Sequence, residues 1–430
     1  MTTAAEWIEE LARFGMRPGL DRINALLDRL GRPEEGIPAV HIAGTNGKGS
    51  TARLIAAALE GAGLRVGLTV SPDLGDRRER ILVNGALARS TAWESLASRV
   101  RAAAAGIADP PTQFEALTAM AFLAFRDAAV DVMVVEVGLG GRHDATNVLR
   151  QPLVTVVTPV ALDHQEVLGK RLEDIAADKA GVVKPGVPVV AAPQAPPVRA
   201  VLMAACRAVD APLVWARGRI LESGPAGVRI RVGADEVASG LLGRHQGTNL
   251  AVAWEAVLSV RRSWGEPLDL GRLKTGLAAA RWPGRLEWVD GMPPLLVDGA
   301  HNLHGANALG RALQEDHLRK RWHLVFGCYV DKPGEAMLNV LVPHVASLVL
   351  ARPAGPRGRD PESLSPAIPA GVPWVVEEDP RTALLRAEEQ AGAVGAVLAA
   401  GSLAVVGAIR AARLGPAVPQ EWPDVWPRRA

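Results

Sequence analysis

The chain has little cysteine and no marked excess of either charge. Only two of its 430 residues are cysteines, Cys206 and Cys328. Two thiols exclude a disulfide framework and a cysteine-rich metal site, and they are typical of a reducing compartment. The formal net charge is +2 with both signs interspersed, so the composition does not indicate a nucleic-acid partner. We therefore expect a cytoplasmic protein that does not bind nucleic acid.

Long hydrophobic runs are also scarce. Residues 391–409 carry no charge, but the segment is rich in Ala and Gly and is interrupted by Gly401 and Ser402. It predicts a core strand that leads into a helix, not a membrane span. The N-terminus predicts an acidic amphipathic helix and lacks the basic start and apolar centre of a signal peptide. We expect neither export nor membrane association.

The chain is long and rich in apolar residues. Its 430 residues are 48% hydrophobic and 22% charged, which indicates a globular protein of two or three domains. Apolar strand patterns alternate with helical ones, as in open α/β sheets. The pair Pro283-Gly284 is the clearest boundary signal. We place the break between Arg285 and Pro294, which gives an N-terminal domain of residues 1–288 and a C-terminal domain of residues 289–430.

Residues 39–51 predict a buried strand, a glycine-rich turn and a helix. Glycine lets consecutive backbone N–H groups point into one concavity, and Lys48 adds a full charge at the start of the helix, so the turn can cradle a polyphosphate. The expected ligand is a nucleoside triphosphate. The common phosphate-loop pattern is imperfect because Gly49 separates Lys48 from the hydroxyl of Ser50. An ordinary glycine-rich turn is the alternative.

Two further segments suggest a bound cation. Glu136 lies near the end of the apolar run 131–137, and an unpaired buried carboxylate is costly, so Mg²⁺ is its natural partner beside a triphosphate. Ser71 ends a predicted strand and can reach the same ion, although a plain turn explains it equally well. The glycines after Glu136 do not form a dinucleotide fingerprint, since His143 stands at the third glycine position. A nicotinamide cofactor is not expected.

Lys179 lies on the apolar stripe of a predicted helix, in register with Leu172, Ile175 and Ala176. A lysine on a buried face must be paired, neutral or modified. The alternative is a frayed helix end near Gly181 that lets the amine reach water. The spacing alone leaves both interpretations open.

Three other polar positions have ordinary explanations. Phe114 and Glu115 can serve as a hydrophobic staple and a first-turn acid of a helix. Asn249 precedes a predicted helix over residues 250–261 and can be its N-cap. Asp298 ends a predicted strand, where open α/β sheets bind ligands.

The order of these motifs is more specific than any one of them. The sequence GTNGKGS at residues 44–50 resembles the phosphate loop of the Mur ligase superfamily. From residue 20 to residue 407 the chain resembles folylpolyglutamate synthase/dihydrofolate synthase. The motifs that carry the resemblance are residues 44–50, 71–72, 114–115, 136–141, 144–147, 162–164, 174–176, 178–181, 243–246, 282–285 and 298–302.

The resemblance implies an α/β fold, in which a P-loop ATPase domain with a parallel sheet precedes a smaller Rossmann-like domain. It also implies roles for individual residues. Lys48, His164 and a carboxylated Lys179 would be catalytic, and Ser71, Glu136 and His164 would hold Mg²⁺, with two ions expected. ATP would contact Thr45, Asn46, Gly47, Lys48, Gly49, Ser50, Asn249, Arg285 and Asp298. The acceptor substrate would contact Met16, Arg17, Pro18, Thr112, Gln113, Phe114, Glu115, His143, Asp144, Ala145 and His301.

The activity that the resemblance implies is ATP-dependent addition of L-glutamate to dihydropteroate, to a folate, or to both, through an acyl phosphate, by a monomer. Three positions depart from the family pattern: Asp73 replaces a usual His, Asp178 replaces Glu, and Leu303 replaces Pro. Asp73 brings an acid near the expected metal and substrate loop, which leaves the acceptor open. The alternatives are a Mur-type ligase with another acceptor and a nucleotide-binding protein without ligase activity.

Overall fold

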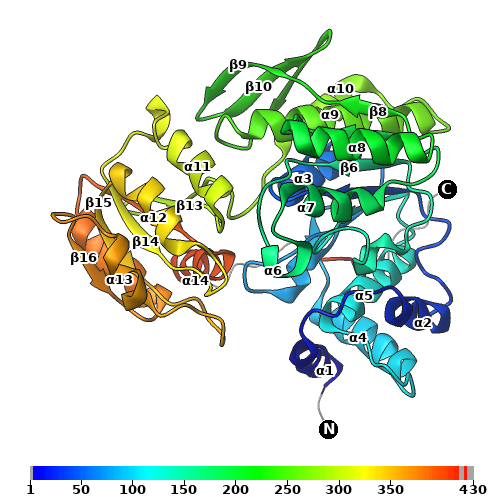
Figure 1. Ribbon diagram of the computed structural model, residues 1–430, viewed down its shortest axis with the longest axis horizontal. Coiled ribbons are helices and arrows are strands. Elements are labelled where there is room, and N and C mark those ends of the chain that lie inside the picture. Colours follow the sequence, from blue (N-terminus) through cyan, green and yellow to red (C-terminus); the bar gives the residue numbers. More distant parts are fainter. Residues whose placement is uncertain (1–2, 416–420, 424–430) are drawn as a thin grey trace.

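A computed structural model describes residues 3–415 and 421–423 of the chain. The elements form two lobes, each around its own parallel-rich sheet (Figure 1). The expected domains also include residues that lie outside the described ones, namely 1–2, 416–420 and 424–430. The predicted α/β class is confirmed.

The first lobe contains an eight-stranded sheet in the order β4-β3-β2-β5-β1-β6-β7-β8. All of its strand pairs are parallel except β2 with β3 and β3 with β4. The strands are β1 (Ala39–Ala43), β2 (Val66–Thr69), β3 (Ile81–Val83), β4 (Ala86–Leu87), β5 (Val132–Glu136), β6 (Val154–Val157), β7 (Val189–Ala191) and β8 (Leu213–Trp215).

Helices cover both faces of this sheet, so its strands are apolar throughout. In β5, for example, Val132 and Val134 join one core and Met133 and Val135 join the other. The first core includes α3 (Lys48–Gly61), α9 (Gln246–Ser263) and α10 (Leu270–Ala279). The second includes α1 (Ala4–Glu10), α2 (Asp21–Arg29), α4 (Ser90–Ala104) and α5 (Gln113–Asp127). Beyond β6, α7 (Leu172–Lys179) and α8 (Pro196–Ala208) pack on the sheet.

The region over residues 213–236 contributes strands to two sheets. Its first strand, β8, extends the main sheet. The others form a separate antiparallel sheet of β9 (Arg219–Gly224), β10 (Gly227–Val232) and β11 (Asp235–Ser239). This sheet packs on α9 through Ile230 and Val232.

The second lobe is an open α/β sheet in the order β12-β13-β17-β14-β15-β16, with only β12 antiparallel. Residues 391–409 form a core strand and a helix, as the sequence predicts. No helix of the described residues is long and apolar enough to cross a membrane. The elements are β12 (Glu287–Val289), β13 (Leu295–Val297), β14 (Trp322–Phe326), β15 (Val345–Leu350), β16 (Trp374–Val376), β17 (Ala396–Ala400), α11 (Leu303–Ala312), α12 (Gly334–Leu341), α13 (Pro380–Ala391) and α14 (Leu403–Leu414).

The chain then returns to the first lobe. Trp422 donates from its backbone N–H to the carbonyl of Leu87 (2.8 Å) and from its indole Nε1 to the carbonyl of Ala86 (2.8 Å). Its side chain is buried in the core beside α4 and α5. The last described residues therefore cover the exposed edge of β4, which limits strand pairing with other chains.

Helix α3, which follows the phosphate loop, crosses α10 at glycines. A Cβ added to Gly276 would lie 2.1 Å from the carbonyl oxygen of Ala57, and one added to Gly61 would lie 2.7 Å from the carbonyl oxygen of Arg272. Only glycine allows the backbones to approach this closely. The contact fixes α3 against the body of the lobe.

We predict that Gly276→Ala destabilises the protein by about 2 kcal/mol, because the methyl group would force two backbones apart. In an unconstrained helix the same change would stabilise by roughly 1 kcal/mol. Chemical denaturation measures the difference. Gly265→Ala is the control, since nothing lies within 4 Å of its added Cβ. A Gly276→Ala protein as stable as the control would contradict this account of the crossing.

Candidate active site

The phosphate loop joins β1 to α3 at the carboxyl edge of the main sheet. Gly44 and Gly47 have φ angles of +143° and +83°, which favour glycine. An added Cβ on Gly47 would lie 2.3 Å from Asn249 Oδ1. Helix α3 begins at Lys48, so the N–H groups of its first turn have no acceptor within the helix and face the loop. The loop is therefore built to receive an anion.

Lys48 and Glu136 lie beside this loop. Lys48 Nζ donates to the carbonyl of Thr45 (3.3 Å) and lies 3.9 Å from Glu136 Oε1. Glu136 also accepts a hydrogen bond from the backbone N–H of Ser71 (3.1 Å). Burial raises the pKa of Glu136, and Lys48 opposes this only in part. The carboxylate thus has room for a further cationic partner.

Lys179 ends α7 and is buried, so the alternative of a frayed helix end that reaches water is wrong. Its Nζ donates to the carbonyl of Gly44 (2.8 Å), at the base of the phosphate loop. Burial, with a contribution from Lys48, lowers the pKa of Lys179 to about 7. A substantial fraction of the amine is therefore neutral at neutral pH, and a neutral amine is a nucleophile.

His164 lies on the loop between β6 and the short helix α6 (Gln165–Leu168). Burial, with a contribution from Lys332, lowers the pKa of His164, so its ring is neutral at neutral pH. Lys48 acts electrostatically on His164, Glu136 and Lys179 alike. Across residues 3–415 and 421–423, no cluster of three or more His, Cys, Asp or Glu side chains could hold a metal ion. A metal ion at this site would therefore need oxygen ligands in addition to His and carboxylate side chains.

Asn249 does not cap a helix. Helix α9 begins at Gln246, three residues earlier than the expected N-cap, because His245 and Gln246 continue the helical turn. The Asn249 amide donates to Gln246 Oε1 (2.8 Å), and Oδ1 faces Gly47. The side chain is thereby directed at the phosphate loop.

Asp298 lies in the second lobe, and Arg285 lies in the segment that joins the two lobes, just before β12. Asp298 accepts hydrogen bonds from the backbone N–H groups of Leu286 (3.0 Å) and Ala300 (2.9 Å), which ties two loops together. Arg285 interacts electrostatically with Asp298 and also with Glu136 of the first lobe. The expected nucleotide contacts therefore come from both lobes.

The three segments expected to contact the acceptor are joined by hydrogen bonds. The N–H of Gly19 donates to the carbonyl of His143 (3.4 Å). Arg22 donates to the carbonyl of Arg17 and pairs with Glu115 through Nε (3.2 Å) and Nη2 (3.1 Å). The segments 16–18, 112–115 and 143–145, far apart in the sequence, are thus neighbours.

Thr112 and Glu115 form a capping box at the start of α5, so Glu115 is a first-turn acid as predicted. The staple hypothesis for Phe114 is wrong, because this residue lies inside α5 instead of before its cap. Its ring instead occupies the space where a Cβ on Gly138 would lie, 2.4 Å from Phe114 Cζ. Phe114 thereby fixes the loop that follows β5.

Asp144 also organises that loop. It accepts hydrogen bonds from the backbone N–H groups of Leu139 (2.9 Å) and Thr146 (3.0 Å) and from the Thr146 hydroxyl (2.6 Å). Burial raises the pKa of Asp144. Because Thr146 donates to the carboxylate, the buried His41 must donate its Nε2–H to Thr146 Oγ1 (2.8 Å).

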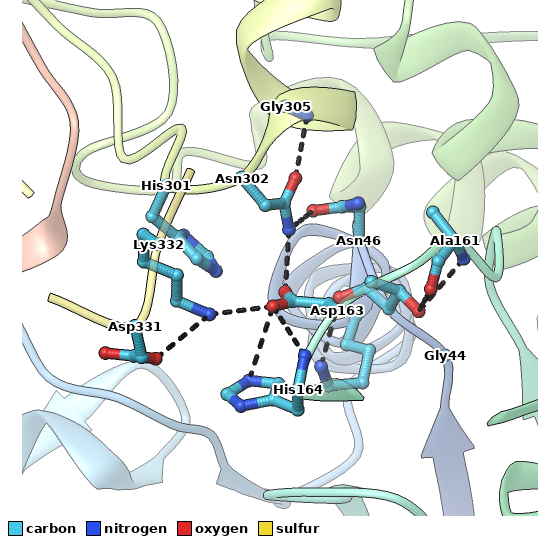
Figure 2. A network of polar contacts seen from close by, with 12 residues as sticks. Gly44, Asn46, Ala161, Asp163, His164, His301, Asn302, Gly305, Asp331 and Lys332 are labelled. Carbon is cyan, nitrogen blue, oxygen red and sulfur yellow. Dashed lines mark hydrogen bonds and ion pairs between the residues drawn. The ribbon is translucent and has the colours of Figure 1, made fainter. Parts of the chain in front are cut away.

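His301 lies beside Lys332, close to the contact of the second lobe with Asp163 (Figure 2). Its Nδ1–H donates to the carbonyl of Gly299 (2.8 Å), which leaves Nε2 as a hydrogen-bond acceptor. Burial, with a contribution from Lys332, lowers the pKa of His301 to about 4. The ring is therefore neutral near pH 7.

Asp73 is held by two arginines. Arg77 and Arg80 contact its Oδ2 at 2.8 and 2.6 Å. Burial alone would raise the pKa of Asp73. The two guanidinium groups together lower this pKa by more than burial raises it, so the net shift is downward. The departure at this position therefore introduces a carboxylate whose charge is compensated within its own loop.

Sequence comparisons agree with this arrangement. The Mur ligase middle domain matches residues 42–192, and the Mur ligase, glutamate ligase domain matches residues 284–403. The dihydrofolate synthase/folylpolyglutamate synthase of Bacillus subtilis (strain 168) is 35% identical over 422 residues, 95% of this chain and 97% of the relative. The chain belongs to the folylpolyglutamate synthase/dihydrofolate synthase family. The predicted resemblance is confirmed.

Solved structures of this family have the same fold. Mycobacterium tuberculosis folylpolyglutamate synthase complexed with ADP and AMPPCP superposes with a TM-score of 0.86 at 33% identity, over 97% of this chain and 99% of that chain. E. coli FolC in complex with DHPP and ADP superposes with a TM-score of 0.84 at 28% identity, over 94% of this chain and 96% of that chain. Those proteins bind nucleotides, and FolC also binds DHPP.

Four residues of this site do not stand out as site residues in the sequence: Arg22, Asp163, Asn302 and Lys332. Arg22 meets Glu115 across 93 positions, and Lys332 meets Asp163 across 169. No local pattern indicates such pairings. Asp163 and Asn302 lie in the family motifs at residues 162–164 and 298–302, which is the only signal in the sequence that could have indicated them.

We predict that Arg22→Gln lowers the free energy of unfolding by about 3 kcal/mol, since it leaves the buried Glu115 carboxylate without its bidentate partner. Denaturant titration measures the loss. Arg171→Gln is the matched control, because Arg171 meets Glu173 at 3.6 Å on the surface, where ion pairs contribute little. A loss below about 1 kcal/mol for Arg22→Gln would mean that the capping box alone satisfies Glu115.

Proposed function

We propose that this protein is an ATP-dependent ligase that joins L-glutamate to dihydropteroate, to a reduced folate, or to both. The observation that carries the proposal is the convergence of Lys48, Glu136 and Lys179 on one phosphate loop, with Arg285 of the connecting segment in electrostatic range of Glu136. Family membership supports the same reaction. A nucleotide-binding protein without ligase activity would have no need for this set of groups.

The reaction joins a carboxylate and an ammonium group, which do not condense unaided in water. In the proposed reaction the acceptor carboxylate attacks the γ-phosphate of ATP, an acyl phosphate forms, and ADP leaves. The deprotonated amine of glutamate then attacks the acyl carbon and releases phosphate. Lys48 and the N–H groups at the start of α3 would offset charge on the transferring phosphoryl group. Holding the reactants in line can lower the barrier by roughly 7 to 11 kcal/mol.

The donor set around the loop fits Mg²⁺. The ion prefers oxygen ligands and usually combines one or two carboxylates with phosphate oxygens and water. Glu136 is a buried carboxylate with incomplete charge compensation, and Ser71 and the neutral His164 would supply the other protein ligands. When bound, Mg²⁺ supplies charge neutralisation of the phosphates. We propose up to two ions, with ATP also held by Thr45, Asn46, Asn249 and Asp298.

The acceptor would lie against the joined segments 16–18, 112–115 and 143–145, and His301 would face it from the second lobe. We propose a division into domains at residues 288 and 289, with the reaction between them. The two cysteines are free and buried, which supports a cytoplasmic setting. The protein would act as a monomer without nucleic-acid or membrane partners.

We also propose that Lys179 is carboxylated. Its neutral amine would attack CO₂, forming an N–C bond and releasing a proton, and the resulting anion would pair with Mg²⁺. The low pKa and burial of Lys179 support this. The added negative charge would also complement Lys48, which otherwise repels the Lys179 ammonium group.

The test of the reaction is phosphate release from Mg²⁺-ATP and L-glutamate, with dihydropteroate or tetrahydrofolate offered separately and each product weighed. We expect the acceptor to gain the mass of one or more glutamates with one or both acceptors, and no product from Lys48→Met. A gain of glutamate mass on both acceptors would define a bifunctional synthase. Folded, ATP-binding protein that extends neither acceptor would refute the folate assignment and favour the Mur-type alternative that Asp73 suggests.

The test of Lys179 uses ¹³C-labelled bicarbonate and NMR. We expect a carbamate resonance that weakens as the pH falls below about 7, because the protonated amine does not attack CO₂. The control, Lys179→Ala, should lack the resonance and lose turnover, with partial recovery on adding formate or acetate. Near-normal turnover of the unsupplemented variant would remove Lys179 from the mechanism, and a missing resonance in the wild type would exclude carboxylation.

A further inference from the structure

Asp163 lies where the two lobes meet, and its carboxylate receives side chains from the second lobe (Figure 2). Lys332 Nζ contacts Oδ1 at 2.7 Å, and Asn302 Nδ2 donates to Oδ2 at 2.8 Å. The side chains of Lys332 and Asp163 are only 7% and 9% exposed. Both carboxylate oxygens are therefore held by a domain other than their own.

Asn302 is fixed in the orientation that this contact requires. Its Oδ1 accepts a hydrogen bond from the backbone N–H of Gly305 (2.8 Å) as the N-cap of α11. The two hydrogens on Nδ2 are then directed away from the helix. One goes to Asp163, and the other to Asn46 Oδ1 of the phosphate loop (3.0 Å). A single capped side chain thus contacts two loops of the first lobe.

Asp163 also acts on its neighbour, His164. The backbone N–H of His164 donates to Asp163 Oδ1 (2.9 Å), the same oxygen that Lys332 contacts. His164 has a φ angle of +51°, a left-handed conformation that is uncommon for residues other than glycine and needs support from its surroundings. The position of the His164 ring therefore depends on a carboxylate that the second lobe holds.

We propose that Asp163 is a positioning residue that couples docking of the second lobe to the arrangement of His164 and the phosphate loop. Moving the lobes apart must break the contacts of Lys332 and Asn302 with Asp163, and that of Asn302 with Asn46. When the lobes dock, the same contacts hold the loops on which the proposed phosphoryl transfer depends. The catalytic consequence rests on the proposed function, whereas the structural coupling does not.

The first test measures the structural coupling between the lobes and does not require the protein to turn over substrate. Hydrogen exchange is measured on the full-length wild type, Asp163→Asn, Lys332→Met and the double variant. Small-angle scattering of the same proteins measures the separation of the lobes. We expect each single variant to lose about tenfold protection in residues 44–50 and 162–168, because a buried charge loses its partner. The double variant should lose no more than about twofold beyond either single one.

Lys274→Met is the matched control. Its amine pairs with Asp235 Oδ1 at the same 2.7 Å, but within the first lobe. We expect it to leave exchange in both segments unchanged. Lys332→Arg keeps the charge and should recover most of the protection. Unchanged exchange in Asp163→Asn, or losses that add in the double variant, would overturn the coupling.

The second test compares turnover with binding. If the synthase reaction is present, Asp163→Asn and Lys332→Met should each lower kcat by roughly 10- to 100-fold, as expected for misplaced reacting groups. The KM for the acceptor should change by less than about threefold, since Asp163 and Lys332 make their polar contacts with one another and with Asn302, His164 and Asp331. A large rise in KM with unchanged kcat would make Lys332 a substrate-binding group instead. If the wild type extends no acceptor, the proposed function fails, and the exchange experiment still decides the coupling.

Discussion

The structure depends on one arrangement in the main sheet, the parallel placement of β1 between β5 and β6. Ile42 is paired with Glu136 on one side and with Val156 on the other. Parallel strands end at the same edge of a sheet, so the loops after all three strands start there together. The phosphate loop, the Glu136 carboxylate and the loop that carries His164 are neighbours for this reason.

Charge is distributed around this edge with little solvent to screen it. Burial raises the pKa of Glu136 and lowers the pKa values of His164 and Lys179. Lys48 opposes the shift of Glu136 and adds to the other two. Burial disfavours the charged form of both the carboxylate and the amine, so partners of opposite charge would stabilise them. Mg²⁺, the phosphates of a nucleotide and a carbamate would complete the balance.

The second lobe is needed for a different reason. It holds Asp163 through Lys332 and Asn302, and Asn302 also contacts Asn46 of the phosphate loop. A site divided between two domains can be assembled by their docking, which would also exclude water from the acyl phosphate of the proposed reaction.

The sequence by itself determined the α/β class, most strands, the phosphate loop and the family, because these follow from local periodicity and from motifs in a fixed order. It also indicated Glu136 and Lys179, since a charged residue within an apolar pattern needs a partner. Only the tertiary structure decided that Lys179 is buried against Gly44, that Asn249 faces Gly47 from inside a helix, and that Asp73 is neutralised by Arg77 and Arg80. It alone joined Arg22 to Glu115 and Lys332 to Asp163. Such contacts depend on how distant segments fold together, and no spacing along the chain encodes the distance between them.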